Sequence, residues 1–581
     1  MIRKLAKSVR EYKKLSILTP ALITGEVIIE CLIPFIIAIL INQIKAGCEL
    51  SVIAIYGGIL FAMACCSLAF GAAAGATGAT ASSGFGKNLR HDLFYRIQSF
   101  AFENIDRFSS SSLITRMTTD VTNVQNAYMM IIRVAVRSPL MFIFSIVMAY
   151  IMGGKLALMF VVVIPFLAFG LILIMRKAVP TFKRVFKKYD KLNESIEENV
   201  QGMRVVKSFV REDYEKEKFG VAADNIRKDF TRVERIIAFN GPLMQFCLYF
   251  DMVVVLLFGS QIIITSKSLN LDVGQFSAML TYGFQILNSL MMLSMVYVMI
   301  TIASESAKRI VEVMEETPAI QTPEHPVAIV ADGSIEFANV SFKYSMRAER
   351  FALSGINLHI RSGETVGILG GTGTSKSTLV QLIPRLYDAT EGTVLVGGVD
   401  VKRYDIKALR DSVAVVLQKN VLFSGTIKDN LRWGNRDATD EEMVNACKLA
   451  QAHDFISAFP DGYDTKIEQG GTNVSGGQKQ RLCIARALLK KPKVLILDDS
   501  TSAVDTRTDA MIRKAFQEFI PDTTKIIIAQ RVASVMDADK IILLEGGRIV
   551  AMGTHQELMQ TNDIYREVYI TQSRGGEEDA E

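Results

Sequence analysis

A glycine-rich stretch in the second half of the chain has the residue types and spacing of a phosphate-binding loop. It follows an apolar run at 365–369 and precedes a helical pattern at 379–386, which is the strand–loop–helix context that a P-loop requires. Backbone N–H groups in such a loop hold phosphates. We therefore expect Lys376 to reach the β- and γ-phosphates of a nucleotide and the Ser377 hydroxyl to bind Mg²⁺. The loop reads Gly370-Gly371-Thr372-Gly373-Thr374-Ser375-Lys376-Ser377-Thr378.

The loop departs from the P-loop pattern at one position. Ser375 stands where a glycine is expected before the lysine. If this position needs a positive φ, serine is strained there, and if it is helical, serine is tolerated.

A second motif supports the nucleotide site. The apolar run 494–497 ends in Asp498, which is the Walker B pattern, and this carboxylate is expected to hold Mg²⁺ directly or through water. About 120 residues separate Lys376 from Asp498. This spacing is too long for a minimal nucleotide-binding fold, so the interval must contain inserted structure.

Inside that interval the sequence resembles the ATP-binding cassette (ABC) family. Ser475-Gly476-Gly477-Gln478, about 20 residues before Asp498, is similar to the family's signature motif. Tyr344 resembles the aromatic residue that stacks on adenine, and Gln418 resembles the Q-loop glutamine, a further Mg²⁺ ligand. Ser502-Ala503-Val504-Asp505 resembles the D-loop. Because six apolar segments precede a single cassette, the whole chain looks like a half-size ABC exporter.

The resemblance implies a shared ATP site between two facing cassettes. Each ATP would lie between the P-loop of one chain and the signature of the other, so ATP binding would close the dimer and hydrolysis would reopen it. ATP and Mg²⁺ are the expected cofactors, and a second half-transporter is the expected partner.

Two residues depart from the family pattern where hydrolysis is concerned. The family expects Glu after the Walker B aspartate, but Asp499 stands there with a side chain one methylene shorter. The family also expects His after the strand at 526–529, but Gln530 follows it, and an amide cannot carry a proton charge. We expect this chain's own P-loop site to bind ATP and to hydrolyse it slowly.

These departures leave two hypotheses about assembly. In the first, the chain is the degenerate-site subunit of a heterodimer of bacterial multidrug type, whose partner has the Glu and the His, and the intact signature completes the competent site. In the second, the chain forms a slow homodimer that tolerates Asp and Gln. An ATPase assay on the chain alone separates the two.

Six segments are apolar enough to cross a bilayer, each with about the 20 residues that a spanning helix needs. Short links join them in pairs, while the long segments 84–126 and 177–236 are polar and rich in Lys and Arg. The positive-inside rule places these segments and the N-terminus in the cytoplasm. The predicted spans are 16–43, 51–80, 127–152, 155–176, 237–265 and 274–302.

The long segments are expected to extend the spanning helices beyond the bilayer as stalks. Apolar residues recur at spacings of three and four among charges in 184–219. We place the stalk tips near 108–112 and 202–210, where the resemblance implies coupling helices that carry movement to the spans.

Three acidic residues fall inside predicted spans: Glu26, Glu30 and Asp251. Such groups are costly in a membrane and line cavities or form pairs. Two roles remain open for them: contact with a substrate or proton, or structural pairing.

Methionines in the sixth span (Met291, Met292, Met295 and Met299) are more typical of packing than of a substrate surface, although Met suits a permissive pocket.

The predicted architecture is a membrane all-α domain of six long transmembrane helices fused to an α/β P-loop nucleotide-binding domain with helical and antiparallel-β subdomains. The bounds are 1–315 for the membrane domain, 316–333 for a linker, 334–573 for the cassette and 574–581 for a disordered acidic tail.

The most consistent function is ATP-driven export of a hydrophobic or amphipathic substrate across the cell membrane. A membrane protein that is regulated by ATP without pumping is the alternative, and an importer subunit is less consistent because importers commonly separate spans from cassette.

The formal net charge of +5 is dispersed, so nucleic acid is not an expected partner. The seven cysteines contain no C-x-x-C pair and are expected to be reduced packed thiols.

Overall fold

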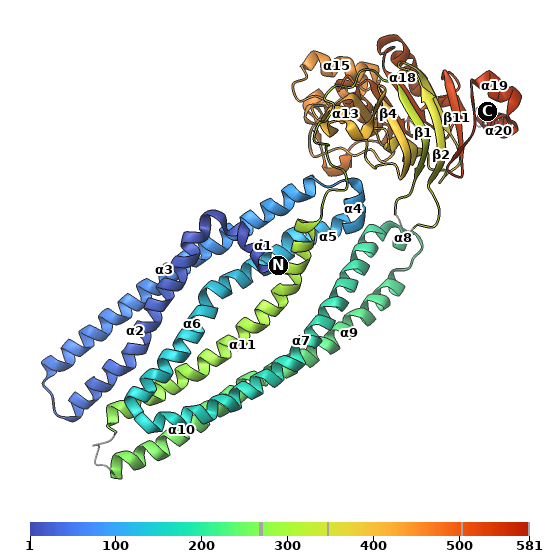
Figure 1. Ribbon diagram of the computed structural model, residues 1–581. Helices are drawn as coiled ribbons and strands as arrows, with labels where there is room; N and C mark the ends of the chain where they lie inside the picture. Colours follow the sequence, from blue (N-terminus) through green and yellow to red (C-terminus); the bar gives the residue numbers. More distant parts are fainter. Residues whose placement is uncertain (266–270, 346–347, 501–502, 579–581) are drawn as a thin grey trace. The chain divides into compact units, whose positions relative to one another are not determined.

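Long helices dominate the first 316 residues, and sheets appear only after them (Figure 1). The computed structural model describes residues 1–265, 271–345, 348–500 and 503–578. Two units form. The helical unit contains Met1–Ser99 and Phe108–Glu316, and the nucleotide unit contains Phe100–Arg107 and Thr317–Glu581.

Within the described residues, six helical stretches are long and apolar enough to cross a membrane. Each predicted span overlaps one of their main helices, so the prediction of six spans is confirmed. At 1.5 Å per residue the 49 residues of α3 extend about 74 Å, far more than the ~30 Å hydrocarbon core. These helices are α2 (Lys13–Lys45), α3 (Leu50–Gln98), α6 (Val121–Gly153), α7 (Leu158–Gln201), α10 (Asn240–Thr265) and α11 (Val273–Glu315).

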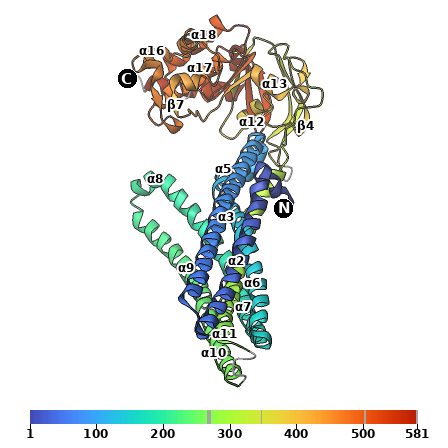
Figure 2. The same ribbon diagram turned by 90° about the vertical axis from the view of Figure 1, so that its left-hand side faces the viewer.

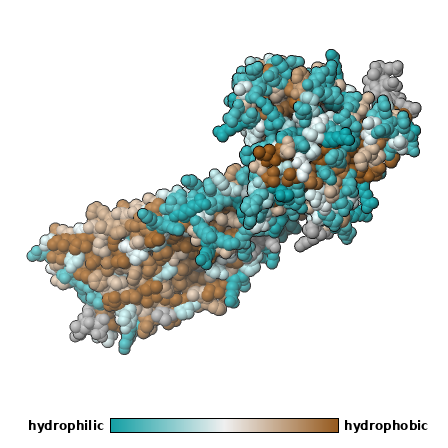
Figure 3. Space-filling view, turned by 45° about the horizontal axis from the view of Figure 1, so that its top comes forward, coloured by the Kyte–Doolittle hydropathy of each residue, from teal (hydrophilic) through white to brown (hydrophobic). Residues whose placement is uncertain are grey.

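Shorter and more polar elements complete the helical unit. The short helix α8 sits at the tip of the hairpin formed by α7 and α9, which leaves the other helices in Figure 2. On the face that Figure 3 shows, apolar side chains cover one long stretch of this unit. The shorter elements are α1 (Ile2–Leu5), η1 (Ala6–Tyr12), α5 (Ser110–Thr115), η2 (Arg116–Asp120), η3 (Gly154–Ala157), α8 (Met203–Ser208) and α9 (Glu212–Ala238).

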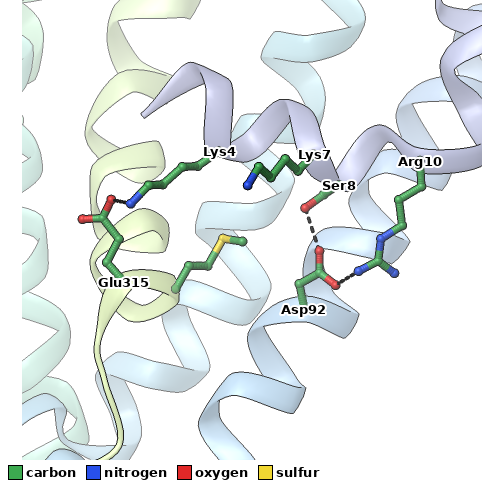
Figure 4. Close-up of a pocket in the computed structure, with 7 residues that line it drawn as sticks. Lys4, Lys7, Ser8, Arg10, Asp92 and Glu315 are labelled. Atoms are coloured by element: carbon green, nitrogen blue, oxygen red, sulfur yellow. Dashed lines mark hydrogen bonds and ion pairs between the residues drawn. The ribbon is translucent and has the colours of Figure 1, made fainter.

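The basic N-terminal segment is bound to two of the long helices (Figure 4). The Ser8 hydroxyl donates to Oδ2 of Asp92 on α3 at 2.7 Å, and the Arg10 guanidinium forms an ion pair with the same carboxylate. Lys4 pairs with Glu315 at the end of α11. These contacts attach residues before the first span to the helix that leads toward the linker.

Two of the three acidic residues at membrane depth belong to one ion cluster. Arg137 on α6 donates from Nη1 to Glu26 at 2.5 Å and from Nη2 to Glu30 at 2.7 Å, both on α2. The sequence did not indicate this partner, and its presence favours structural pairing for these two carboxylates.

Asp251 on α10 lies in a different environment. It is 3% exposed, and its Oδ1 has no hydrogen-bond partner among the described residues. A side-chain carbon added at Gly283 on α11 would lie 2.5 Å from its Oδ2, so glycine there makes room for the carboxyl group.

The nucleotide unit also includes most of α4 (Phe102–Phe108), a short helix that interrupts the helical unit in sequence. Asn104 donates to the Thr317 carbonyl at 3.0 Å and accepts from the Ala319 N–H at 2.9 Å. The Tyr387 hydroxyl donates to Asp106 at 2.7 Å. Helix α4 therefore lies directly before the segment 108–112 in which the sequence predicts the first stalk tip.

Three sheets organise the nucleotide unit. The largest has the order β12-β11-β3-β10-β9-β6, and only β12 is antiparallel to its neighbour. A four-stranded antiparallel sheet has the order β2-β1-β4-β5, and β7 pairs with β8. The strands are β1 (Ile335–Phe342), β2 (Leu353–Ile360), β3 (Thr365–Leu369), β4 (Glu391–Val396), β5 (Val399–Asp400), β6 (Val413–Val416), β7 (Gly425–Thr426), β8 (Lys466–Ile467), β9 (Val494–Asp498), β10 (Thr524–Ile528), β11 (Lys540–Glu545) and β12 (Arg548–Gly553).

Helices flank these sheets and supply the inserted structure between the two nucleotide motifs. They are α12 (Lys376–Gln381), α13 (Ile406–Ser412), α14 (Ile427–Leu431), α15 (Asp440–Leu449), α16 (His453–Ser457), α17 (Gly476–Leu489), α18 (Thr506–Phe519), α19 (His555–Thr561) and α20 (Asp563–Glu578). Helix α20 includes part of the segment 574–581 that the sequence predicted to be disordered, and 579–581 lie outside the described residues.

The sheet register brings the predicted site together. Ile528 at the end of β10 pairs with Ile368 on β3 and with Asp498 on β9. The carboxyl ends of three parallel strands therefore meet at one edge, which is where open α/β sheets bind ligands. The fold class predicted from the sequence is confirmed.

Candidate nucleotide site

A cavity of about 360 Å³ opens at this edge of the large sheet. The P-loop follows β3, Asp498 ends β9 and Asp499 follows it, and Gln530 comes after β10, so these predicted site residues lie together. The lining of the cavity consists of Tyr344, Thr372, Gly373, Thr374, Ser375, Lys376, Ser377, Thr378, Gln418, Asp498, Asp499, Ile528 and Gln530.

The backbone of the P-loop explains two of its residue types. A side-chain carbon at Gly370 would lie 2.3 Å from the carbonyl oxygen of Leu544, so only glycine fits there. Ser375 has φ +70° and ψ +25°, which is the left-handed region. Of the two conformations that the sequence left open, the loop adopts the one in which serine is strained.

Lys376 lies folded against its own loop. Its ammonium donates to the carbonyl oxygens of Gly370 and Gly371, at 2.7 Å each. Burial lowers the pKa of Lys376 below its ordinary value, and the carboxylates of Asp499 and Asp498 oppose that effect. The group is thus a partly desolvated cation placed beside two anions.

The donor set for a divalent cation is oxygen-rich. The Ser377 hydroxyl donates to Oδ1 of Asp498 at 2.9 Å, and burial raises the pKa of that carboxyl group. Hydroxyl, carboxylate and amide oxygens are the ligands that Mg²⁺ prefers. Ser377, Asp498 and the Gln418 side chain therefore fit the Mg²⁺ that accompanies ATP.

Tyr344 lies at the mouth of the cavity and is half-exposed. Its hydroxyl is 2.8 Å from Oγ1 of Thr378, and its ring packs edge-on against Tyr387, with centroids 5.3 Å apart. An exposed ring face held in this way can stack on a purine. No sequence pattern indicated Tyr387, which supports this ring and also contacts α4.

Two amides meet the carboxylate that follows the Walker B aspartate. Oδ2 of Asp499 accepts from Nε2 of Gln530 at 2.9 Å and from Nε2 of Gln418 at 3.4 Å. Asp499 itself has φ +46°, a conformation that Asp adopts more readily than most residues. The structure thus brings the two unusual residues, Asp499 and Gln530, into direct contact.

The signature residues do not line this cavity. Ser475 caps the first turn of α17 in a reciprocal capping box with Gln478, at 2.9 Å and 3.3 Å. A side-chain carbon at Gly477 would lie 2.8 Å from the carbonyl oxygen of Ala503, and Gly476 faces the same residue. The signature helix therefore packs closely against the D-loop of its own chain.

The described part of the D-loop is also ordered by hydrogen bonds. Gln480 on α17 accepts from the Ala503 N–H at 3.1 Å. Asp505 caps α18 by accepting from the Thr508 N–H at 2.9 Å. Hydrogen bonding to Thr508 lowers the pKa of Asp505. Ser502 lies outside the described residues.

Comparisons with known proteins agree with this geometry. The family described as "ABC transporter transmembrane region" matches residues 17–290, and the family described as "ABC transporter" matches residues 353–502. A Bacillus subtilis protein named "Uncharacterized ABC transporter ATP-binding protein YfiB" is 35% identical over 571 residues, covering 98% of each chain. The Mycobacterium tuberculosis protein Rv1273c, with the same description, is 32% identical over 578 residues, covering 99% of this chain and 98% of that one.

A solved structure shows the same fold. The structure of a bacterial Atm1-family ABC exporter with ATP bound superposes with a TM-score of 0.82 at 24% identity, over 97% of this chain and 98% of that chain. Nearly full-length coverage in both kinds of comparison includes the six spans and the cassette together. The chain therefore belongs to the ABC transporter family, and it carries the transmembrane region and the ATP-binding domain of a half-size transporter on one polypeptide.

Proposed function

We propose that this chain is one subunit of an ATP-driven exporter that moves a hydrophobic or amphipathic substrate by alternating access. It pairs with a different half-transporter, and the two resulting ATP sites are unequal. The site on this chain's own P-loop turns over slowly, whereas its signature residues Ser475–Gln478 complete a competent site on the partner's P-loop.

One observation carries the inequality: the side chain that meets the Asp499 carboxylate from the end of β10 is the amide of Gln530. Gln530 and Gln418 both donate to it, and the cavity lining that the structure describes contains no histidine. Asp499 can orient a water molecule, but the Gln530 amide cannot take or return a proton. General acid–base help is typically worth about 10²–10⁴-fold, so this pocket binds nucleotide better than it cleaves it.

The remaining residues of the pocket suit nucleotide binding. The P-loop residues Gly370–Thr378 and the Lys376 ammonium are placed to hold phosphates, and Tyr344 is placed to stack on adenine. Ser377, Asp498 and Gln418 are the residues that would hold Mg²⁺, which supplies charge neutralisation on the phosphate oxygens when it is bound.

The signature is built for a ligand that another chain provides. Ser475 and the following glycines begin a helix of 14 residues, and Ser475 and Gly476 are exposed. They do not line this chain's own cavity, so their backbone donors are available to a nucleotide held by the partner. Asp505 lies two residues after Ala503, the D-loop residue that contacts α17.

The tip around α8 supports a partner as well. Phe209 and Val210 are 73% and 81% exposed, and Val205 beside them is also exposed. Exposed apolar side chains at the end of a long stalk mark a contact surface. We assign this tip to the cassette of the second half-transporter.

The membrane assignment follows from the same arrangement. The six spans make this a multi-pass membrane protein, and we place the N-terminus, the stalks and the cassette in the cytoplasm and the spans in the cell membrane. The basic residues of the stalks support this orientation through the positive-inside rule.

The test compares the chain alone with the chain co-purified with its partner. Both preparations are reconstituted, their ATPase rates are measured, and ATP-dependent uptake of a fluorescent amphiphile into inside-out vesicles is followed. We expect slow turnover alone and fast turnover with uptake in the pair. Fast turnover by the chain alone would refute the heterodimer, and ATP binding without uptake in the pair would favour an ATP-regulated membrane protein.

A further inference from the structure

The side chain of Gln572, on the last helix of the chain, bridges the bend that contains Gln530. Its Nε2 donates to the carbonyl oxygen of Gln530 at 3.0 Å, and its Oε1 accepts from the N–H of Val532 at 2.8 Å. A primary amide is the side chain that can donate and accept at once in this way. The two backbone groups lie on either side of Arg531, so one side chain fixes both ends of the bend.

The helix that presents Gln572 is itself anchored. Tyr565 on α20 is 1% exposed, and its hydroxyl is 2.6 Å from Nδ1 of His555. Tyr569 also packs against the buried core of the nucleotide unit. Residues 565, 569 and 572 are spaced by four and three, so they share one helical face. Gln572 therefore reaches the bend from a fixed position.

Two backbone hydrogen bonds anchor the ends of the bend, and the Gln572 contacts hold the residues between them. The Ala529 N–H bonds back to Ile368 on β3 at 3.3 Å, and the Ser534 N–H bonds to Arg531 at 3.2 Å. The Gln572 amide lies between these anchors and holds the main chain on both sides of Arg531. The direction of the Gln530 side chain, which donates to Asp499 at 2.9 Å, depends on that main chain.

We propose that Gln572 is a positioning residue for the switch position, and that α20 thereby sets how the side chain at 530 faces the carboxylate at 499. The proposal rests on the function proposed above, in which this pocket holds ATP. Gln572 acts through the backbone of Gln530 and Val532, and it is not a catalytic residue. Because misplacement on the order of 1 Å can cost about a hundredfold in rate, loosening the bend is expected to slow hydrolysis without weakening ATP binding.

Three variants separate this role from general support of the helix. Gln572→Ala removes both hydrogen bonds. Gln572→Glu keeps the acceptor for the Val532 N–H and removes the donor to the Gln530 carbonyl. Thr571→Ala changes the adjacent exposed residue and serves as the matched control.

The variants are examined in the co-purified dimer, with the partner's P-loop lysine replaced so that the single-turnover rate reports this chain's site. Hydrogen exchange is followed in peptides covering 529–534 and, separately, 563–571. ATP affinity is measured with a fluorescent nucleotide analogue.

For Gln572→Ala we expect exchange in 529–534 to become about tenfold faster, since one or two hydrogen bonds are lost. The single-turnover rate should fall about tenfold or more at unchanged ATP affinity, and Gln572→Glu should lie between Gln572→Ala and the control. Exchange in 563–571 should not change.

Three results would overturn the proposal: a rate equal to that of Thr571→Ala, a slower rate without faster exchange at the bend, or faster exchange throughout α20. The unmodified protein gives an independent check of the proposed function. If it does not bind ATP, the proposed function fails, whereas the exchange result still reports whether Gln572 holds the bend.

Discussion

Introducing a glutamate at 499 and a histidine at 530 is the sharpest test of the proposed slow pocket. In the structure, Oδ2 of Asp499 accepts from Gln530 at 2.9 Å and from Gln418 at 3.4 Å. Glutamate at 499 would extend the carboxylate by one C–C bond, about 1.5 Å. Because a shift on the order of 1 Å can change a rate about a hundredfold, and a group that carries a proton contributes about 10²–10⁴-fold, both changes are large.

We therefore expect the double variant Asp499→Glu, Gln530→His to raise ATP turnover at this site by about 10²–10⁴-fold. The two gains should not simply multiply, because the two side chains are in contact and neighbouring substitutions couple. The backbone opposes part of the change. Asp499 has φ +46°, and glutamate is less tolerant of that conformation, so the variant should also be less stable by about 1 kcal/mol.

The assay uses the co-purified dimer with the partner's P-loop lysine replaced, so that turnover comes from this chain's site. Phosphate release and thermal melting are measured together, and Asp498→Asn in the double variant serves as the inactive control. No gain in turnover with ATP affinity intact would refute the view that the carboxylate reach and the missing imidazole limit this pocket. A wild-type site that already turns over rapidly would refute it as well.

Four further outcomes are expected. Replacing Ser375 with Gly should relieve left-handed strain and raise the unfolding free energy by less than about 1 kcal/mol in thermal melts, whereas Ala should give no gain. Tyr387→Phe removes the hydroxyl that donates to Asp106, so hydrogen exchange in 100–107 should become about tenfold faster at unchanged ATP affinity. Arg137→Met leaves two carboxylates without their cation and should destabilise the protein by roughly 3 kcal/mol in the same melts. Because burial lowers the pKa of Lys376, its positive charge is lost at a pH below the ordinary 10.5, and ATP affinity should fall as the pH rises toward that value, while a Lys376→Arg variant should show a flatter titration.

The local motifs made the centre of the nucleotide site predictable. A glycine loop after an apolar strand and an aspartate at the end of another strand are short-range patterns, and the parallel sheet brings their ends together. The six spans were predictable for the same reason, since each depends on a continuous apolar stretch.

Features that depend on distant partners could not be predicted. Glu26 and Glu30 share a helix face in the sequence, but only the packing of α2 against α6 shows that Arg137 lies between them. The conformation of Ser375 depends on how the loop closes against the neighbouring strand, so residue type alone left two possibilities. Gln572 gives no local signal at all, because a single glutamine on a C-terminal helix is ordinary until the bend beside it is known.

The membership of α4 in the nucleotide unit changes how the polypeptide joins its two parts. The backbone passes between the units after Ser99, after Arg107 and after Glu316, so it does so three times. A protease cut within 317–333 would therefore sever only one of three covalent connections, and α4 would remain held by Asn104 and Tyr387. A cassette expressed from Thr317 onward would lack those eight residues, and Tyr387 would lose its contacts with Phe102 and Asp106, so it is an incomplete folding unit.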